Sequence, residues 1–157
     1  MKTTVIIIII SVALFFAGCA TLPPPAQMKE EVEDFELPKL PEDGKAIVYI
    51  VRPSSLGTLV DFSVFLDDKE PESKMGYTRG RQYIYFNLEP GEHQILSKAE
   101  NWAEANITVA LGDIIFIQQE PNMGFVVARN SLFEIQDYVG KYHVKNCTLG
   151  TIINLDK

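Results

Sequence analysis

The chain has 157 residues, of which 46% are hydrophobic, and a formal net charge of −7 at pH 7. This length is sufficient for one domain with its own hydrophobic core. The acidic balance disfavours nucleic acid as a partner, because phosphate groups are bound by basic surfaces and the lysines and arginines are scattered here.

The N-terminus reads as a secretory signal. Lys2 precedes an apolar run over residues 5–17 that only Ser11 interrupts, and the run ends in Phe16-Ala17-Gly18-Cys19. A cysteine directly after two small residues resembles a bacterial lipoprotein signal, in which the cysteine is diacylated on sulfur and becomes the first residue. We therefore expect a signal peptide over residues 1–18, cleavage after the motif Phe16-Ala17-Gly18, and attachment of palmitate-type acyl chains to Cys19.

Two alternatives to this anchor stay open. One is an ordinary cleaved signal, and the other is an uncleaved transmembrane helix, for which the apolar run falls short of the ~20 residues that a span needs. Phe16 also stands where lipoprotein signals usually carry an aliphatic residue. With Ala20 after Cys19, the sequence resembles the class that is sorted to the outer membrane. The expected location is the cell envelope, on the outer membrane facing the periplasm if the cell is Gram-negative.

Cleavage would leave 139 residues with 13 basic and 21 acidic side chains, a net charge of −8. If Cys19 carries the lipid, Cys147 has no intramolecular partner. We then expect Cys147 to be a small, partly buried apolar residue, with an intermolecular disulfide as the alternative in an oxidising compartment.

Residues 19–44 are predicted to be the lipidated cysteine followed by a flexible tether. Pro23-Pro24-Pro25 is stiff, and five acids crowd into positions 30–36. A flexible chain of this length would place the domain about 25–30 Å from the lipid on average, and about 80 Å away at full stretch. A short helix over residues 28–35 is the alternative.

The folded domain is predicted over residues 45–157. Residues 46–51 form a β-branched run typical of a strand that is buried on both faces. Strand alternation follows over 62–66 and 83–88, and the turn Glu89-Pro90-Gly91-Glu92 leads to a strand over 93–99. Residues 67–69 read as a turn and residues 101–104 as a loop.

The second half of the domain continues the pattern. Alternation over 106–111 and a strand over 114–119 flank Gly112-Asp113, which predicts a tight hairpin. Two shorter runs follow over 124–128 and 132–135. Apolar residues then recur at helical spacing, with Asp137 as the expected N-cap, although Gly140 has low helix propensity. The type of the last apolar run, over 152–155, is left open. The predicted fold is mostly all-β, an antiparallel sandwich with a short C-terminal helix.

Several blocks occur in an order that resembles a family of small bacterial lipoproteins containing a domain of unknown function. They are Lys45 to Arg52-Pro53, Leu88-Glu89-Pro90-Gly91-Glu92-His93, Leu111 to Ile117, and Met123-Gly124-Phe125 with the later Arg129 and Leu132. The match covers residues 45–145, with a longer stretch than usual at 69–74. The resemblance implies a β-sandwich and a lipoprotein, and it assigns no activity or catalytic residue.

Side chains with catalytic potential do not form a recognised constellation. His143 and Cys147 lie four apart, so a helix would place them on one face. Two ligands do not make a zinc site, and no third group orients them as a nucleophilic pair. Acids in turns, such as Glu89 and Glu92, are normally solvated. We expect no enzymatic activity, catalytic residue, metal or cofactor.

The aromatic residues give the better indication of an interaction surface. Tyr83 and Tyr85 share one face of a strand, and Trp102 lies in a polar stretch. Aromatic faces stack on sugars or anchor protein interfaces. The alternative is that the tyrosines are covered by a helix or by the second sheet. We expect a membrane-anchored, non-enzymatic binding or structural module whose partner is an envelope protein or a cell-wall polymer. A sugar- or peptidoglycan-binding module is the second hypothesis, and an unrecognised hydrolase is the third.

Overall fold

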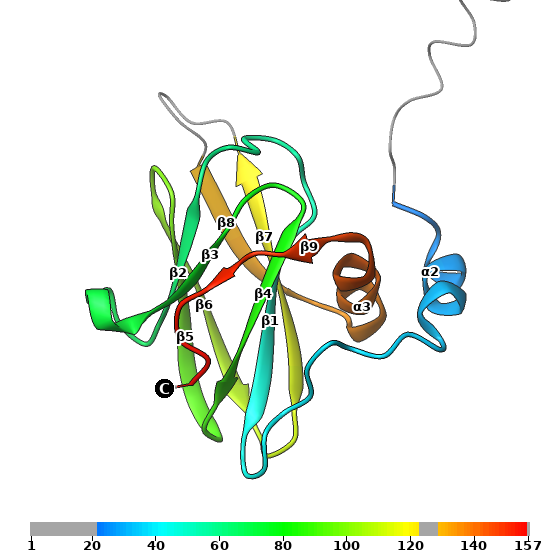
Figure 1. The fold of residues 1–157 in the computed structure, drawn as a ribbon, viewed down its shortest axis with the longest axis horizontal. Helices are drawn as coiled ribbons and strands as arrows, with labels where there is room; N and C mark the ends of the chain where they lie inside the picture. The colour runs from blue at the N-terminus through cyan, green and yellow to red at the C-terminus, as the bar shows by residue number, and fades with distance from the viewer. Residues whose placement is uncertain (1–21, 123–128, 157) are drawn as a thin grey trace, which may run out of the picture.

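A computed structural model describes residues 22–122 and 129–156, which fold into two facing β-sheets with two helices on one side (Figure 1). Within these residues, sheet A has the strand order β8-β7-β1-β4-β9 and sheet B the order β10-β3-β2-β5-β6. The fold is a mostly β, sandwich-like structure with a short C-terminal helix, as the sequence predicts. The strands are β1 Ala46–Arg52, β2 Phe62–Leu66, β3 Lys74–Thr78, β4 Gln82–Leu88, β5 Gly91–Lys98, β6 Trp102–Val109, β7 Ile114–Asn122, β8 Arg129–Ile135, β9 Thr148–Leu149 and β10 Thr151–Ile152.

Strand β1 is the centre of sheet A and is buried along its whole length, which confirms the prediction for residues 46–51. It pairs antiparallel with β4 and parallel with β7. Because side chains alternate along a strand, β1 contributes to two apolar layers. Val48 and Ile50 point into the core between the sheets, whereas Tyr49 and Val51 belong to a second cluster on the outer face.

The turn at Gly112-Asp113 is not a hairpin, because β6 and β7 lie in different sheets. The turn itself forms, and Asp113 N–H donates to Ala110 O (3.1 Å). Its other backbone groups bond to the start of β1, where Gly112 N–H donates to Lys45 O (3.0 Å) and Ile47 N–H donates to Asp113 O (2.9 Å). The chain therefore crosses to sheet A and runs parallel to β1. The local sequence predicted the turn correctly but not the partner strand.

The expected loop over residues 101–104 is also wrong, since β6 begins at Trp102. Ala99 N–H donates to Asn101 O (3.0 Å), so the chain reverses within very few residues and Trp102 already pairs with Lys98 of β5. The polar residues of this stretch belong to a strand that exposes one face. The short run predicted over residues 124–128 lies outside the described residues.

Helix α3 (Asp137–Asn146) covers the outer face of sheet A. Gln136, rather than the predicted Asp137, occupies the N-cap, and Asp137 instead forms an ion pair with Lys141 (2.9 Å). Gly140 faces Phe116 of β7 so closely that no side chain fits between them. The residue that weakens the helix by propensity is thus the one that lets it reach the sheet.

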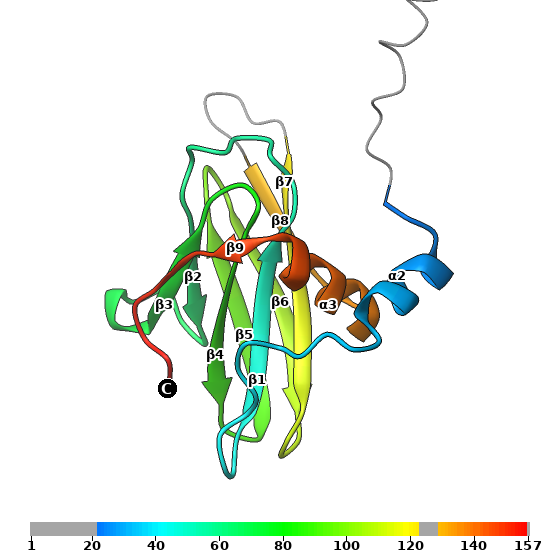
Figure 2. The ribbon, with the colours of Figure 1, turned by 45° about the vertical axis from the view of Figure 1, so that its right-hand side comes forward.

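The N-terminal segment differs from the expected flexible tether. Helix α2 (Pro25–Val32) buries Met28 and Val32, and both helices lie on the same side of the strands (Figure 2). The chain from residue 33 to residue 44 then runs along sheet A, where Phe35 and Leu37 pack against its outer cluster. The apolar residues spaced between the acids supply this packing, so the acids remain exposed while the segment is docked.

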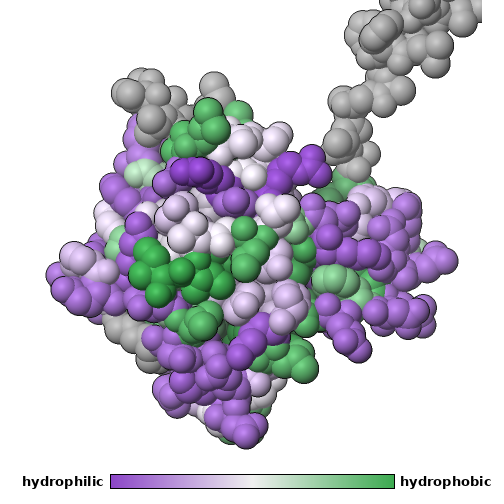
Figure 3. All heavy atoms as spheres, in the orientation of Figure 1, coloured by the Kyte–Doolittle hydropathy of each residue, from purple (hydrophilic) through white to green (hydrophobic). Residues whose placement is uncertain are grey.

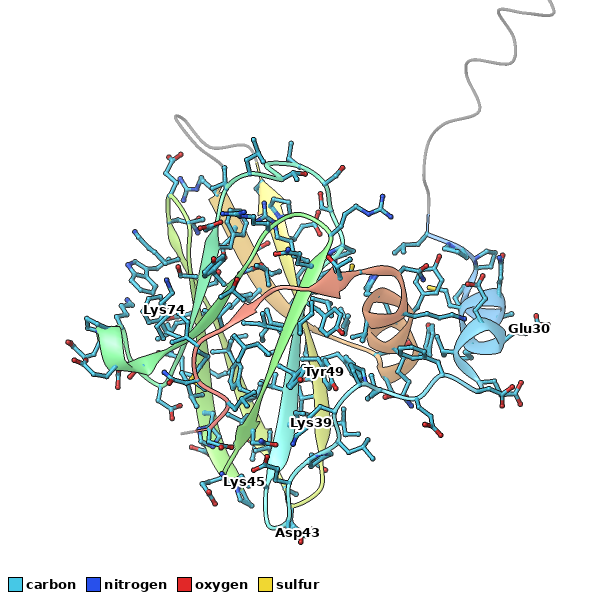
Figure 4. All side chains as sticks on the ribbon, in the orientation of Figure 1. Glu30, Lys39, Asp43, Lys45, Tyr49 and Lys74 are labelled. Carbon is cyan, nitrogen blue, oxygen red and sulfur yellow. The ribbon has the colours of Figure 1, made fainter. Side chains whose placement is uncertain are left out.

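Polar contacts also hold this docked segment to the domain. The hydroxyl of Tyr49 accepts a hydrogen bond from Lys39 N–H (3.0 Å) and donates one to Lys39 O (2.5 Å), and the two residues lie close together in Figure 4. The Lys29 ammonium lies over the Tyr138 ring of α3, 4.9 Å from its centroid. Glu30 points away from the domain on the far side of α2. The segment is therefore part of the folded unit.

The C-terminal segment closes one side of the sandwich, because β9 pairs with β4 of sheet A and β10 pairs with β3 of sheet B. Gly76 and Gly150 permit this close approach: an added Cβ on Gly150 would lie 3.0 Å from Tyr77 O. Leu149, Ile153 and Leu155 of this segment remain exposed, and Figure 3 shows an apolar patch on the same face. On the opposite side, the Asn101 side chain bonds to the backbone of Asn130 in β8.

Candidate functional site

The outer face of sheet B carries an open groove of about 580 Å³ beside β5 and β6. Its polar lining comes from two strands and the turn after β2. Because Gln94 pairs with Asn106 and Glu92 pairs with Thr108, these four side chains share one face of the sheet. The groove is lined by Asp67, Glu92, His93, Gln94, Asn106, Ile107 and Thr108.

Hydrogen bonds fix the geometry at the centre of the groove. The Asp67 carboxylate accepts from the Gln94 N–H (3.0 Å) and lies 3.0 Å from Nδ1 of His93. Nε2 of His93 lies 2.8 Å from the carbonyl oxygen of Glu89. Both ring nitrogens of His93 therefore lie next to fixed hydrogen-bond partners. This arrangement favours a structural role for His93 over general-base catalysis, which needs a ring nitrogen that is free to accept a proton. The side-chain amide of Gln94 donates to Asn106 Oδ1 (3.1 Å).

Trp102 lies on the same face of β6 as Asn106, about 13 Å away along the strand. It is partly buried rather than displayed on a loop. Its ring packs against Phe65 of β2 (centroids 5.2 Å apart), and the ammonium groups of Lys69 and Lys98 lie 5.1 and 5.3 Å from its centroid. The indole is thus covered mainly by side chains of its own sheet, with lysines at its margin.

Tyr83 and Tyr85 belong to the opposite side of the molecule. They lie on the outer face of sheet A with Tyr49, whose ring centroid is 6.2 Å from that of Tyr83 and 5.4 Å from that of Tyr85. Tyr83 is only 8% exposed. Burial raises the pKa of Tyr83. The two tyrosines therefore pack in the layer beneath α3, which is the alternative that the sequence left open, and the structure does not bring them together with Trp102.

His143 and Cys147 lie near the end of α3, and their environment keeps both uncharged at neutral pH. Burial lowers the pKa of His143 to about 4. Burial also raises the pKa of the Cys147 thiol to about 11, against a smaller opposite effect of Arg81. A thiolate nucleophile needs the reverse shift. Within residues 22–122 and 129–156, no three His, Cys, Asp or Glu side chains are grouped so as to hold a metal ion.

One buried polar cluster lies outside these predictions. Arg52 is fully buried at the end of β1, and its guanidinium donates to the carbonyl oxygens of Val60 (2.8 Å), Gly57 (2.8 Å), Leu56 (3.0 Å) and Thr78 (3.2 Å). It also stacks on Phe62 at 3.7 Å. Burial lowers the pKa of Arg52 to about 10. The only sequence signal for it was the Arg-Pro block, and its role is to fix the loop after β1.

The lipidation motif, Phe16 to Cys19, lies outside the described residues. Among the helices of residues 22–122 and 129–156, none is both long and apolar enough to span a bilayer.

The fold and the surfaces described above define a small β-sandwich-like protein with a groove on one sheet. Comparison with known proteins gives its family. A family model described as "Protein of unknown function (DUF2846)" matches residues 42–134. An uncharacterized protein of Haemophilus influenzae is 30% identical over 134 residues, which cover 85% of this chain and 76% of that protein. The chain belongs to the DUF2846 family, in agreement with the resemblance seen in the sequence.

Proposed function

We propose that the protein is a lipoprotein of the cell envelope, anchored through Cys19, whose domain acts as a non-enzymatic binding module. The observation that carries the binding role is the unequal covering of the two sheets. Helix α3 and the segment over residues 33–44 cover the outer face of sheet A, and α2 packs on α3 on the same side. The outer face of sheet B is left with the open groove. The anchor rests on the signal sequence and on the cysteine that ends it.

The states of the reactive side chains support a non-enzymatic role. Burial keeps the His143 imidazole and the Cys147 thiol uncharged at neutral pH, and both ring nitrogens of His93 lie within hydrogen-bonding distance of fixed partners. The free face instead offers amides, hydroxyls and carboxylates in fixed positions, which suits recognition of a polar partner.

The anchor is tested by metabolic labelling with palmitate, and the chain supplies its own control. It has two cysteines, so Cys19→Ser should abolish label and processing while Cys147→Ser should leave both unchanged. Wild-type protein that carries no label would overturn the anchor. Label that persists in Cys19→Ser would place the modification elsewhere.

The binding face is tested with a photo-crosslinking amino acid in intact cells. Placed at Asn106 or Thr108, on the exposed face of β6, it should capture a discrete partner. Placed at Glu33, just beyond α2 on the other side of the molecule, it should not. Equal yields from all three positions would contradict a partner surface at the groove.

A cell-wall glycan is the second candidate partner, because Trp102 and the polar groove share one sheet face. Carboxylates accept hydrogen bonds from hydroxyls, side-chain amides both donate to and accept from them, and indole rings stack on sugars. Purified protein should then sediment with isolated cell wall, and Trp102→Ala combined with Asn106→Ala should reduce the pelleted fraction. Tyr85→Phe, on the other sheet, is the matched control. Sedimentation that the double variant does not change would reject this partner.

A further inference from the structure

A second pocket, of about 400 Å³, lies where the described chain begins. It is formed by the first described residues, the loop after β1, the turn between β3 and β4, and the end of α3. The residues that matter for its chemistry are Leu22, Ser54, Arg81, His143, Asn146 and Cys147. None of the described residues that line it is acidic.

The polar groups of this pocket are suited to an anion. Arg81 is exposed, and its guanidinium forms no ion pair with any acid in the part of the chain that the structure describes. Its backbone is held in place, with N–H donating to Ser54 O (3.3 Å) and the carbonyl accepting from Thr148 N–H (3.0 Å). A planar guanidinium on a fixed backbone is well suited to phosphate oxygens.

Two further residues that line the pocket have distinctive hydrogen bonding. His143 is 3% exposed, and its Nε2 has no hydrogen-bond partner among the described residues. A buried ring nitrogen without a partner costs free energy. Because this atom is closed off from solvent, His143 contributes to the wall of the pocket, and Arg81 and Ser54 supply the accessible polar groups. Ser54 Oγ accepts from Leu56 N–H (3.2 Å), so its own hydroxyl proton remains available to donate.

The position of the pocket identifies the source of the anion. Leu22 lines the pocket and follows Cys19 by three residues, which span at most about 11 Å. Because α2 and the segment after it are docked on the domain, they add no slack between the pocket and the anchor. If Cys19 carries acyl chains, the pocket therefore lies at the depth of the lipid headgroups.

We propose that this pocket binds the phosphate of a zwitterionic phospholipid headgroup in the membrane that holds the lipidated Cys19. The proposal rests on the proposed lipid anchor. Arg81 and Ser54 contact the phosphate oxygens, and Leu22 lies against the glycerol and upper acyl region. The headgroup is zwitterionic because the mature chain carries a net charge of −8 with five acids at positions 30–36, which repel an anionic surface.

The test measures protection of Cys147, which lines the pocket and is the one free thiol once Cys19 is acylated. Mature lipidated protein is reconstituted into phosphatidylethanolamine vesicles and, separately, into galactolipid vesicles, which contain no phosphate. The rate of alkylation by a water-soluble maleimide is measured at pH 8 in both. We expect alkylation to be at least tenfold slower in the phospholipid vesicles.

Variants relate this protection to the pocket. Arg81→Gln and Ser54→Ala should each bring the ratio of the two rates close to one. Arg79 lies two residues from Arg81, and its side chain pairs with Asp61. The control variant Arg79→Gln should therefore keep the full ratio of the two alkylation rates. Because each variant is compared with itself in the two vesicles, any change in the intrinsic reactivity of Cys147 cancels.

Three outcomes would overturn the proposal. Equal rates in both vesicles for the wild type would show that no phosphate-dependent ligand covers the thiol. Protection that Arg81→Gln and Ser54→Ala preserve would place the headgroup elsewhere. Protection in galactolipid vesicles upon addition of millimolar inorganic phosphate would assign the pocket to a free anion. Failure of the lipid anchor is separate, because it would already appear as absent palmitate label on the wild-type protein.

Discussion

The contact between Gly140 and Phe116 gives the sharpest test of how the C-terminal helix is held. An alanine Cβ at position 140 would lie 2.5 Å from Cβ of Phe116 and closer still to its Cγ and Cδ1. Phe116 is buried and stacks on Tyr49 with ring centroids 5.4 Å apart, so it has no space to retreat into. Alanine at 140 therefore forces α3 away from the sheet.

Two opposing effects set the magnitude. Helix propensity favours alanine over glycine by about 1 kcal/mol. Overpacking a close-packed core costs about 1–3 kcal/mol, or more where several groups must move together. Here a helix and two stacked rings must shift, so overpacking outweighs propensity. We expect Gly140→Ala to lower the free energy of unfolding by about 2 kcal/mol.

Urea unfolding of four proteins tests this reasoning: wild type, Gly140→Ala, Phe116→Ala and the double variant. Phe116→Ala removes the two atoms closest to the added methyl group. The cost of Gly140→Ala should therefore fall by at least about 1 kcal/mol in that background, a coupling typical of contacting residues. Stabilisation by Gly140→Ala alone, or strict additivity of the two substitutions, would refute the packing argument.

Three further predictions concern the docked segment, the buried arginine and the buried histidine. Tyr49→Phe should lower the free energy of unfolding by about 1–3 kcal/mol and speed proteolysis within residues 33–44, because the Lys39 backbone loses its hydrogen-bond partner. Tyr85→Phe should do neither, and equal cleavage of the two variants would contradict the role of the Tyr49 hydroxyl. Arg52→Met should cost about 3 kcal/mol by leaving buried carbonyls unpaired, against less than about 1 kcal/mol for the exposed Arg79→Met, as compared by urea midpoints. The pKa of His143 falls from 6.5 to about 4 on folding, so between these pH values the unfolded state binds a proton that the folded state does not, and the free energy of unfolding should drop as the pH falls through this window. His143→Leu should flatten this dependence of stability on pH, whereas His93→Gln, the control, should keep it. Parallel pH profiles for the two variants would reject the assignment.

The sequence was most reliable where a feature depends on neighbouring residues. A continuous apolar run placed β1 correctly, because a strand that is buried on both faces needs apolar residues at every position. Alternation placed the cores of β2 and β4, where apolar residues recur at every second position. The turn signals were also real. Gly112-Asp113 does turn, yet its hydrogen bonds to Lys45 and Ile47 send the chain to a strand more than 60 residues earlier. A dipeptide determines that the chain turns but not which strand it meets.

The sites were harder to predict because they join distant segments. Ser54, Arg81 and His143 form one pocket only after the loop, the turn and the helix are placed. The two-residue strands β9 and β10 carry no periodicity at all, and they form because Gly76 and Gly150 allow backbones to approach closely. For Trp102 the polar neighbours were misleading, since a strand with one exposed face also carries polar residues at every second position.

The docked N-terminal segment changes how far the proposed anchor lets the domain reach. A flexible chain of residues 19–44 would let it move about 25–30 Å from the membrane on average. Because α2 packs on α3 and the Lys39 backbone is held by Tyr49 of sheet A, only the two residues between Cys19 and Leu22 remain, and the distance from Cys19 to Leu22 is about 11 Å at most. The helices then lie on the membrane side, and the groove on sheet B, on the opposite side of the sandwich, faces outward. Under the proposed anchor, the partner has to come to the membrane surface, because the domain cannot extend to meet it.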